Sequence, residues 1–283
     1  MNFSNFVNTL HITLNIIRLD FACGFSLLTR LPVSWIIPSS YSSLTPLPFA
    51  RSLWCWSLIG ICIGGFTGGV LSFLESFHIP SFVAACCALS AQALLTGALH
   101  EDGLADMADG FGGTTPQQRL TIMRDSHIGS YGVIALCLSY GIRCGALMVF
   151  SPLIVPLVCG LTGGLARMAM VFIPAWLPPA RTNGLAATLF PLPRQALIRA
   201  CWLFCLADIA LTLALTFVFP FLMTRFFALL LLPLLVASAG VYILAYYARH
   251  YLGGYTGDVL GGCVVITECL VLTLFSAMLS SFL

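Results

Sequence analysis

Seven apolar stretches, each close to the length of a membrane-spanning helix, limit what this chain can fold into. They cover residues 53–74, 81–99, 131–150, 154–173, 197–219, 226–247 and 259–282. One helical crossing of a bilayer core takes about 20 apolar residues. Long segments of alternating polarity, which would indicate a β-barrel, are missing from the sequence. We therefore predict an all-α fold, a polytopic membrane helix bundle with about seven transmembrane helices, and we treat residues 1–283 as a single integral-membrane domain.

Charged residues make up only 8% of the chain, whereas a typical soluble domain has about 25%. So few charges cannot cover a water-exposed surface, which excludes a soluble globular enzyme and a disordered chain. The net charge of +2 is too small to indicate a nucleic-acid partner. The twelve cysteines lie mostly in apolar runs and form no C-x-x-C pair, so we interpret them as small packing residues.

The first 50 residues follow a different pattern. Asn8, His11, Asn15 and Arg18 recur at helical spacing, and apolar residues fill the opposite face. This pattern is typical of an amphipathic helix that lies along the membrane interface rather than crossing it. The Pro- and Ser-rich stretch 32–48 is expected to be a loop that leads into the first span.

The arginines give the orientation of the bundle, because all twelve basic residues are arginine. If the N-terminus is cytoplasmic, nine of them lie on or near the cytoplasmic side: Arg18, Arg30, Arg51, Arg119, Arg124, Arg181, Arg194, Arg199 and Arg249. Only Arg225 lies on the far side. Cytoplasmic loops of membrane proteins carry such an excess of positive charge. We therefore expect the longer connections, and the functional site, to face the cytoplasm.

Half of the ten acidic residues fall within 25 positions: Glu101, Asp102, Asp106, Asp109 and Asp125. In a helix, Asp102, Asp106 and Asp109 share one face, because successive residues are about 100° apart. Adjacent carboxylates repel one another unless a cation neutralises them, and hard oxygen ligands suit Mg²⁺ or Mn²⁺. We predict a metal site formed by these three residues, with Glu101 as a further candidate ligand. The alternative is a loop whose acids face water.

Arg124, Asp125 and Ser126 follow, just before a predicted span, and glycines follow them. An Arg beside a metal site is suited to bidentate recognition of phosphate, and Ser and Gly residues supply hydroxyl and backbone donors. Asp258 ends a Gly-rich segment on the same side of the membrane. These features predict a site for a Mg²⁺-bound pyrophosphate at the membrane surface. The alternative is that Arg124 only anchors its loop to the cytoplasmic side.

Four charged residues fall inside predicted spans: Arg143, Arg167, Asp208 and Glu268. An unpaired charge at the bilayer centre costs about 2.5–3.5 kcal/mol, so such residues pair or line a polar cavity. We predict that Arg167 and Glu268 belong to the site. For Arg143 and Asp208 a structural pair and a functional role are both open, as they are for His100, which adjoins the acidic run.

Several motifs, in the same order along the chain, resemble the cobalamin synthase family, the adenosylcobinamide-GDP ribazoletransferases. They are Leu27-Leu-Thr-Arg-Leu-Pro-Val33, His100-x-Asp-Gly-x-x-Asp-x-x-Asp-Gly110, Ile122-Met-Arg-Asp-Ser126 with Gly129, Arg181-x-x-Gly-Leu185, and Gly254-x-Thr-Gly-Asp258 with Glu268. His127 departs from the pattern, because many members have Arg there.

The resemblance implies the final assembly step of coenzyme B12 in a bacterial inner membrane. Such an enzyme joins adenosylcobinamide-GDP to α-ribazole or α-ribazole 5′-phosphate, releases GMP and uses Mg²⁺. The implied catalytic residues are Asp102, Asp106, Arg124 and Asp258, and the implied metal ligands are Asp102, Asp106, Asp109 and Glu101. The implied substrate-binding residues are Arg30, His100, Asp125, Ser126, Arg167 and Glu268. The partners would be these small molecules and membrane lipid, and a homo-oligomer is compatible with the sequence.

Two other classes of membrane protein compete with this interpretation. Polyprenyl and CDP-alcohol transferases also bind pyrophosphate through Asp-rich helices. The polyprenyl enzymes typically have two well-separated Asp-rich motifs, and the CDP-alcohol enzymes have Asp-Gly-x-x-Ala-Arg, whereas Asp106 stands here without the Arg. A transporter is the second class. It is disfavoured because the chain has no internal repeat and its acids gather at one surface.

Overall fold

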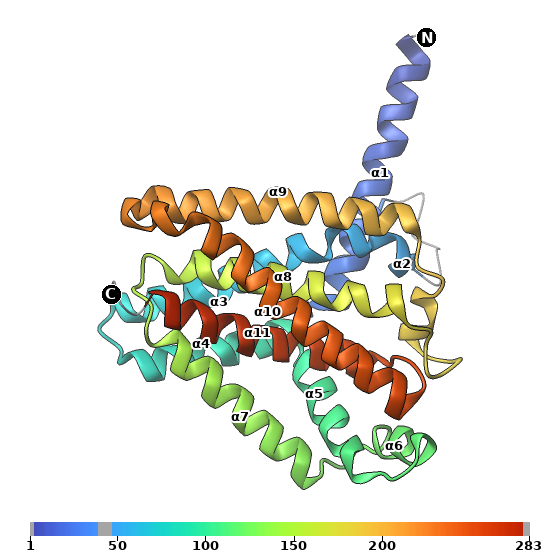
Figure 1. The fold of residues 1–283 in the computed structure, drawn as a ribbon. Helices are drawn as coiled ribbons and strands as arrows, with labels where there is room; N and C mark the ends of the chain where they lie inside the picture. The colour runs from blue at the N-terminus through green and yellow to red at the C-terminus, as the bar shows by residue number, and fades with distance from the viewer. Residues whose placement is uncertain (1–2, 39–46, 280–283) are drawn as a thin grey trace.

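The computed structural model describes residues 3–38 and 47–279, and their side chains from residue 9 onward. The described chain forms helices and contains no strand beyond an isolated bridge between Pro179 and Tyr255, which confirms the all-α prediction (Figure 1). The helices are α1 (Phe3–Leu28), α2 (Phe49–Ser52), α3 (Trp56–Ser76), α4 (Ser81–Thr96), α5 (Leu99–Asp109), α6 (Pro116–Ile122), α7 (Ser130–Leu147), α8 (Val155–Trp176), α9 (Arg194–Val218), α10 (Phe226–Tyr247) and α11 (Gly257–Leu279).

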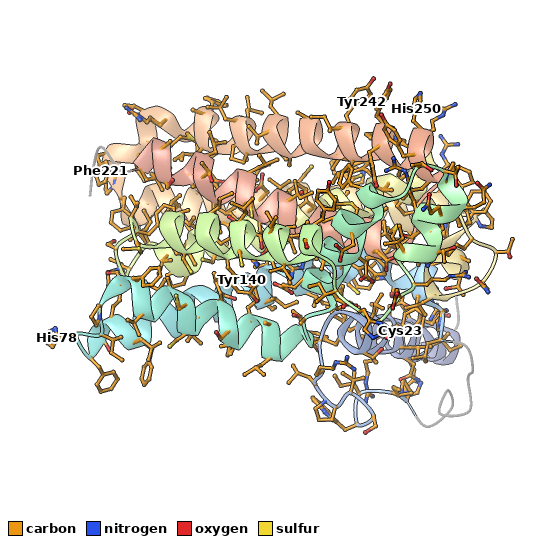
Figure 2. All side chains as sticks on the ribbon, turned by 90° about the horizontal axis from the view of Figure 1, so that it is seen from below. Cys23, His78, Tyr140, Phe221, Tyr242 and His250 are labelled. Carbon is orange, nitrogen blue, oxygen red and sulfur yellow. The ribbon has the colours of Figure 1, made fainter. Side chains whose placement is uncertain are left out.

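Seven stretches of helix in the described residues are long and apolar enough to cross a membrane. Six of them contain α3, α7, α8, α9, α10 and α11 and match predicted spans. The seventh is the N-terminal stretch Thr9–Leu28. The connections between the spans alternate between the two ends of the bundle. Figure 2 accordingly shows His78 and Phe221 at one end and Cys23 and His250 at the other.

The predicted span 81–99 is shorter than expected. The helix breaks after Thr96, and α4 and α5 meet at an angle of 92°. Gly97 and Ala98 both adopt left-handed conformations, with φ of 66° and 54°, which no continuous right-handed helix allows. The 16 residues of α4 rise only about 24 Å, less than a bilayer core of about 30 Å. The acidic helix α5 therefore does not continue the apolar helix α4 but runs almost perpendicular to it.

Helix α1 lies across the bundle rather than alongside the spans (Figure 1). Leu19 and Cys23, near its C-terminal end, are fully buried, whereas Leu10 and Leu14 are exposed. Asp20 joins α1 to the next segment, because it accepts hydrogen bonds from Arg51 Nε at 2.7 Å and from Trp54 Nε1 at 2.9 Å. This crosswise placement fits the predicted interfacial helix, although the length and apolarity of Thr9–Leu28 would also allow a crossing. Of the predicted loop 32–48, residues 39–46 lie outside the described residues, as does the side chain of Asn8.

The centre of the bundle is a close contact between α3 and α8. Gly64 faces the Cys159 carbonyl so closely that any Cβ would collide with it, and Gly60 and Gly163 approach each other in the same way. Glycine at these positions allows the two backbones to pack directly against each other, as small residues do between membrane helices. Helix α8 is therefore almost wholly buried, and its Arg167 lies in the protein interior.

Helix α5 packs against α7 and α11 at one end of the bundle (Figure 1). A Cβ on Gly103 would come within 2.8 Å of the Asp258 carbonyl oxygen, so α5 touches the first turn of α11 through its backbone. This contact brings the acidic run beside Asp258, which is 156 positions away from Asp102 in the chain. The fold thus gathers both acidic motifs at the same end of the molecule.

Candidate active site

A cavity of about 300 Å³ opens at this end of the bundle, and we call it the site cavity. Its walls come from the C-terminal part of α1, from α3, α5 and α8, from the connection between α8 and α9, and from the start of α11. The polar residues in its wall are His100, Asp102, Arg181, Asn183, Thr256 and Asp258. Two of the predicted catalytic residues, Asp102 and Asp258, therefore share one cavity.

Asp106 lies one helical turn beyond Asp102 on α5, as the predicted helix requires. Burial, together with the negative charges of Asp102, Asp258 and Asp109, raises the pKa of Asp106 to about 7, against the opposing effect of the Arg181 guanidinium. The cluster therefore holds more negative charge than its neighbouring arginine neutralises. Repulsion between neighbouring carboxylates of this kind is relieved when a cation binds between them.

Two arginines belong to the site: Arg181 lines the cavity, and Arg124 contacts Asn183 of its wall. Arg124 Nη2 donates to Asn183 Oδ1 at 3.2 Å, and Arg181 Nη1 lies 3.9 Å from Asp258 Oδ2. Arg181 Nη2 also donates to the Leu120 carbonyl at 2.8 Å, which fixes its direction. Burial lowers the pKa of Arg181, and the like charge of nearby Arg124 lowers it further. Two guanidinium groups held close to each other attract an anion such as a phosphate.

Asp109 has a different surrounding from the one that we predicted. Its two carboxylate oxygens accept hydrogen bonds from the backbone N–H groups of Gly129 at 2.7 Å and Gly132 at 2.8 Å. A carboxylate is favoured at a helix N-terminus, here that of α7. Asp109 is buried and is not part of the cavity wall. The structure thus places it as an anchor between α5 and α7; like Asp106 it lies outside the cavity wall, and its charge acts on Asp106.

Asp125 and Ser126 are exposed in the loop beside Arg124 and do not line the cavity. Asp125 accepts a hydrogen bond from the backbone N–H of His127 at 3.0 Å and pairs with the His127 ring at 2.7 Å. These hydrogen bonds lower the pKa of Asp125. The pair shapes the loop, and the structure does not bring it to the carboxylate cluster.

Arg30 and His100 frame the break between α4 and α5. The backbone N–H of Arg30 donates to the Leu95 carbonyl at 2.7 Å, and its exposed side chain packs against Gly97, where any Cβ would collide with it. His100 is buried and contributes to the cavity wall. Its Nε2 has no hydrogen-bond partner within the described part of the chain.

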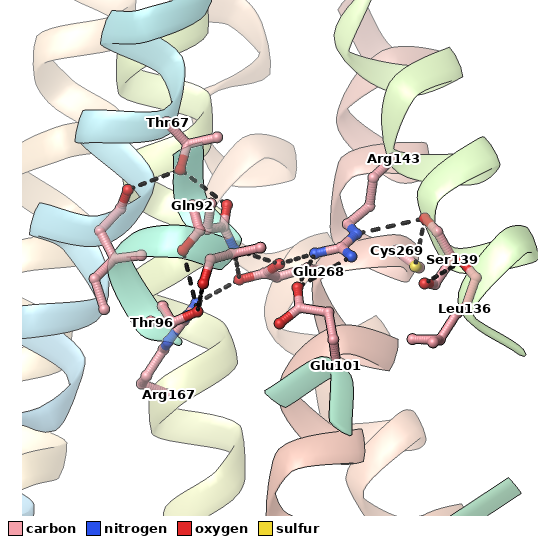
Figure 3. Close-up of polar contacts among 12 residues, drawn as sticks. Thr67, Gln92, Thr96, Glu101, Leu136, Ser139, Arg143, Arg167, Glu268 and Cys269 are labelled. Carbon is pink, nitrogen blue, oxygen red and sulfur yellow. Dashed lines mark hydrogen bonds and ion pairs between the residues drawn. The ribbon is translucent and has the colours of Figure 1, made fainter. Parts of the chain in front are cut away.

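A buried network of charges lies deeper in the bundle (Figure 3). The Glu268 carboxylate accepts hydrogen bonds from Arg143 Nη1 at 3.0 Å, from Arg167 Nη1, and from Gln92 Nε2. Glu101 Oε1 accepts from Arg143 Nη1 at 3.2 Å and from Nη2 at 3.3 Å. None of these five residues is more than 5% exposed. The network joins α4, α5, α7, α8 and α11.

This network contains three residues that sequence analysis assigned to the site. Glu101, Arg167 and Glu268 were predicted in the metal and substrate site. Inside the bundle Glu101 pairs with Arg143 and Arg167 pairs with Glu268, and none of the three lines the site cavity. The physical reason is that charges in a medium of low dielectric constant are stable only when they are paired. Arg143 proves to be a structural partner of two acids.

The pairing of Glu101 with Arg143 also sets the rotation of α5. Because successive helical residues are about 100° apart, a helix that turns Glu101 into the bundle turns Asp102 toward the cavity. Asp208 takes no part in this arrangement. It is buried on α9, and the described residues give it no ion pair.

Sequence reasoning did not select Arg181, Asn183 or Thr256 as site residues. The connection between α8 and α9 carries Arg181 and Asn183, and a parallel bridge holds that connection against Tyr255. Ala180 N–H donates to the Tyr255 carbonyl at 2.8 Å, which keeps the connection next to the start of α11. One feature of the sequence could have identified Arg181 as a site residue. It is the motif Arg181-x-x-Gly-Leu185, which lies on the predicted cytoplasmic side together with the other motifs.

Comparisons with known proteins identify relatives of this chain. The family model described as cobalamin-5-phosphate synthase matches residues 20–276. Proteins named adenosylcobinamide-GDP ribazoletransferase are similar over nearly their whole length. The one from Rhizobium etli is 37% identical, over 90% of this chain and 96% of its own. The one from Bradyrhizobium diazoefficiens is 36% identical, over 91% of this chain and 93% of its own.

No solved structure matches this chain. The family match covers all the motifs from Leu27 to Glu268, and it favours this family over the polyprenyl and CDP-alcohol transferases and over transporters. The relatives named above are transferases, and the match extends over more than nine-tenths of their length. The chain belongs to the cobalamin-5-phosphate synthase family, and it is a transferase of cobalamin biosynthesis.

Proposed function

We propose that this protein joins adenosylcobinamide-GDP to α-ribazole or α-ribazole 5′-phosphate and releases GMP. The relatives' names give this donor, and the observation that carries the proposal is the composition of the site cavity. Asp102 and Asp258 meet Arg181 in its wall, and Arg124 stands at its rim. Carboxylates for a cation, beside guanidinium groups for phosphates, are the groups that a pyrophosphate-bearing donor requires.

Mg²⁺ fits the residues of this site. The described residues contain no set of three His, Cys, Asp or Glu side chains already arranged around a metal position. Mg²⁺ does not require such a cage, because it usually keeps several waters and binds one or two carboxylates together with substrate phosphates. Asp102 and Asp106 of α5, together with Asp258, would supply those carboxylates. The bound ion would neutralise charge on the pyrophosphate and polarise its phosphorus–oxygen bonds.

The protein's own groups then position the donor and move one proton. A ribose hydroxyl of the acceptor attacks the phosphorus that carries cobinamide, a new phosphorus–oxygen bond forms, and the bond to the GMP oxygen breaks with its electron pair. Asp258 or a neighbouring carboxylate accepts the hydroxyl proton. Arg124 and Arg181 stabilise the negative charge that moves onto the departing GMP. Positioning and charge stabilisation supply most of the catalysis in phosphoryl transfer.

The proposal is tested by identifying the nucleotide product. Purified protein in liposomes is supplied with adenosylcobinamide-GDP, α-ribazole and Mg²⁺, and the nucleotides are separated by chromatography. We expect GMP and a cobalamin product in equal amounts, and neither when α-ribazole is omitted. Release of GDP or of free pyrophosphate in place of GMP would contradict the proposed reaction.

We expect Arg124→Lys and Arg181→Lys to lose about 10²–10³-fold in kcat, the typical effect of removing one contact to transition-state charge. Lysine keeps the charge but loses the planar fork that binds a phosphate with two hydrogen bonds. The matched control is Arg249→Lys, an exposed position on the same side that does not line the cavity. If the Arg124 and Arg181 variants are as active as this control, neither guanidinium contacts the pyrophosphate.

We place the protein in the bacterial inner membrane with the site cavity facing the cytoplasm and lipid around the exposed apolar side chains of the spans. The arginine distribution supports this orientation. A membrane-impermeant thiol reagent should label Phe77→Cys, at the opposite end of the bundle, in intact cells, but should label Thr114→Cys only after permeabilisation. Labelling of Thr114→Cys in intact cells would reverse the orientation.

A further inference from the structure

A second cavity, of about 340 Å³, lies between α8, α9 and α10, and we call it the lateral cavity. The three helices pack against one another in pairs, and all three belong to membrane spans (Figure 1). Among the lining side chains that the structure describes, only those of Trp176 and Ser238 carry a strong hydrogen-bonding group, and both residues are exposed. The inner wall of the lateral cavity is therefore apolar.

The lateral cavity has the depth of one leaflet of the bilayer. Trp176 ends α8 directly before the connection that carries Arg181, so it marks the side of the membrane on which the site cavity lies. From Trp176 back to Leu165, the lining part of α8 extends over about 16 Å at 1.5 Å per residue. This is close to half of a hydrocarbon core of about 30 Å. Cys205 and Ser238 line the cavity and are exposed within their spans, so the cavity opens toward the lipid.

The dimensions of the lateral cavity select its occupant. Its volume and length give a cross-section of about 21 Å², whereas a helix with a diameter of about 10–12 Å needs about 80–110 Å². A helix of a second copy therefore does not fit, but one hydrocarbon chain does. Water is not suited to an apolar cavity, and an empty cavity forfeits the dispersion contacts of its lining atoms. The molecule present at this depth is phospholipid.

A basic side chain stands where the headgroup of such a lipid would lie. Arg194 begins α9 and is exposed, seven residues before Cys201 of the cavity wall. Seven residues are nearly two helical turns, so Arg194 shares the lining face of α9 and lies about 10 Å closer to the membrane surface. Among the described residues, no acid forms an ion pair with it. A guanidinium group at this level attracts an anionic headgroup.

We propose that the lateral cavity is a specific site for an anionic phospholipid of the leaflet on the side of the site cavity. One acyl chain lies in the cavity against Phe172 and Phe204. The phosphate group lies at the membrane surface beside Arg194, and Trp176 packs against the chain just below it. A lipid without net charge, such as phosphatidylcholine, binds there more weakly.

The first test measures which lipids the protein retains from liposomes of equal parts phosphatidylglycerol and phosphatidylcholine, by native mass spectrometry. Ser238 lines the cavity, whereas its neighbour Ala239 is also exposed but does not. Ser238→Phe should lower the fraction of chains with bound phosphatidylglycerol at least tenfold, and Ala239→Phe, the matched control, should leave it unchanged. Equal fractions in the two variants would overturn the proposal. A lipid-free dimer that Ser238→Phe dissociates would also overturn it, because a second copy would then fill the cavity.

The same measurement tests the headgroup contact. Arg194→Gln should lower the ratio of bound phosphatidylglycerol to bound phosphatidylcholine about fivefold, the effect of one arginine near an anionic lipid surface. The matched control is Arg199→Gln, because Arg199 is also exposed but lies about 140° away from Arg194 around α9. If both variants change the ratio equally, the charge of the whole surface selects the lipid and the assignment of Arg194 is wrong.

A fluorescence measurement covers the case in which Ser238→Phe fails to fold. A small share of phosphatidylglycerol with brominated acyl chains, in phosphatidylcholine liposomes, should quench part of the tryptophan emission of the unmodified protein. Trp176→Phe should remove most of this quenching. Trp202→Phe should keep it, because Trp202 is exposed on α9 but does not line the cavity. Quenching that is lost with Trp202 and kept without Trp176 would indicate ordinary contact with the bilayer and would overturn the proposal.

Discussion

Asp102→Asn and Asp106→Asn should each abolish GMP release while the protein remains folded in the membrane. Asparagine preserves the size of the side chain but removes the charge that holds a cation. Loss of a single electrostatic contact to the reacting phosphate typically costs about 10²–10³ in rate, and loss of a metal ligand should cost at least as much. Folding should not suffer, because each substitution removes one carboxylate from a group that repels itself.

The measurement is the initial rate of GMP release at saturating substrates and ordinary Mg²⁺, with thermal unfolding as the check on folding. Glu75→Gln, near the end of α3 at the opposite end of the bundle, is the matched control for loss of a carboxylate. If either Asp variant retains the rate of this control, the carboxylates of α5 do not form the metal site.

The second large effect concerns the stability of the buried network. Removal of one partner from a buried ion pair typically destabilises a protein by about 3–5 kcal/mol, because it leaves an uncompensated charge. Arg143→Met should therefore lower the free energy of unfolding by about that amount, since both Glu101 and Glu268 lose a partner. The double variant Arg143→Met with Glu101→Gln should recover most of the loss, because Arg167 and Glu268 then remain as a neutral pair.

Chemical unfolding of the detergent-solubilised protein compares the single variant, the double variant and the unmodified chain. Because the two substitutions are in contact, their effects should not add. If the single Arg143→Met variant is as stable as the unmodified chain, the ion pairs of Arg143 do not contribute to the free energy of unfolding. A double variant less stable than the single one would contradict the proposed balance of charges.

The spans could be predicted from the sequence because they depend on local composition. An apolar stretch of sufficient length forms a helix in lipid whatever surrounds it. The break between α4 and α5 was not predictable in the same way. Glycine often ends a helix, but it also occurs inside the spans of this chain, as at Gly60 and Gly64, so Gly97 alone did not indicate a break. The break depends on distant contacts, since Arg30 packs against Gly97 and its N–H bonds Leu95.

The acidic cluster was only half predictable. The helical spacing of Asp102 and Asp106 was sufficient to place them on one face, and the structure has that helix. Glu101, next to Asp102, points into the bundle because its partner Arg143 comes from α7, 42 residues later. Asp109 is engaged by backbone N–H groups of another helix, and backbone groups leave no signature in a sequence. Tertiary contacts decided both cases.

The most direct test of the metal site at Asp102, Asp106 and Asp258 is a Mn²⁺ titration followed by electron paramagnetic resonance. Purified protein is titrated in the presence of adenosylcobinamide-GDP and without acceptor, and the signal of free Mn²⁺ is measured. A metal site at these residues requires that the unmodified chain remove one more Mn²⁺ per molecule from solution than the double variant Asp102→Asn with Asp106→Asn. Equal binding of Mn²⁺ by the two proteins would contradict it.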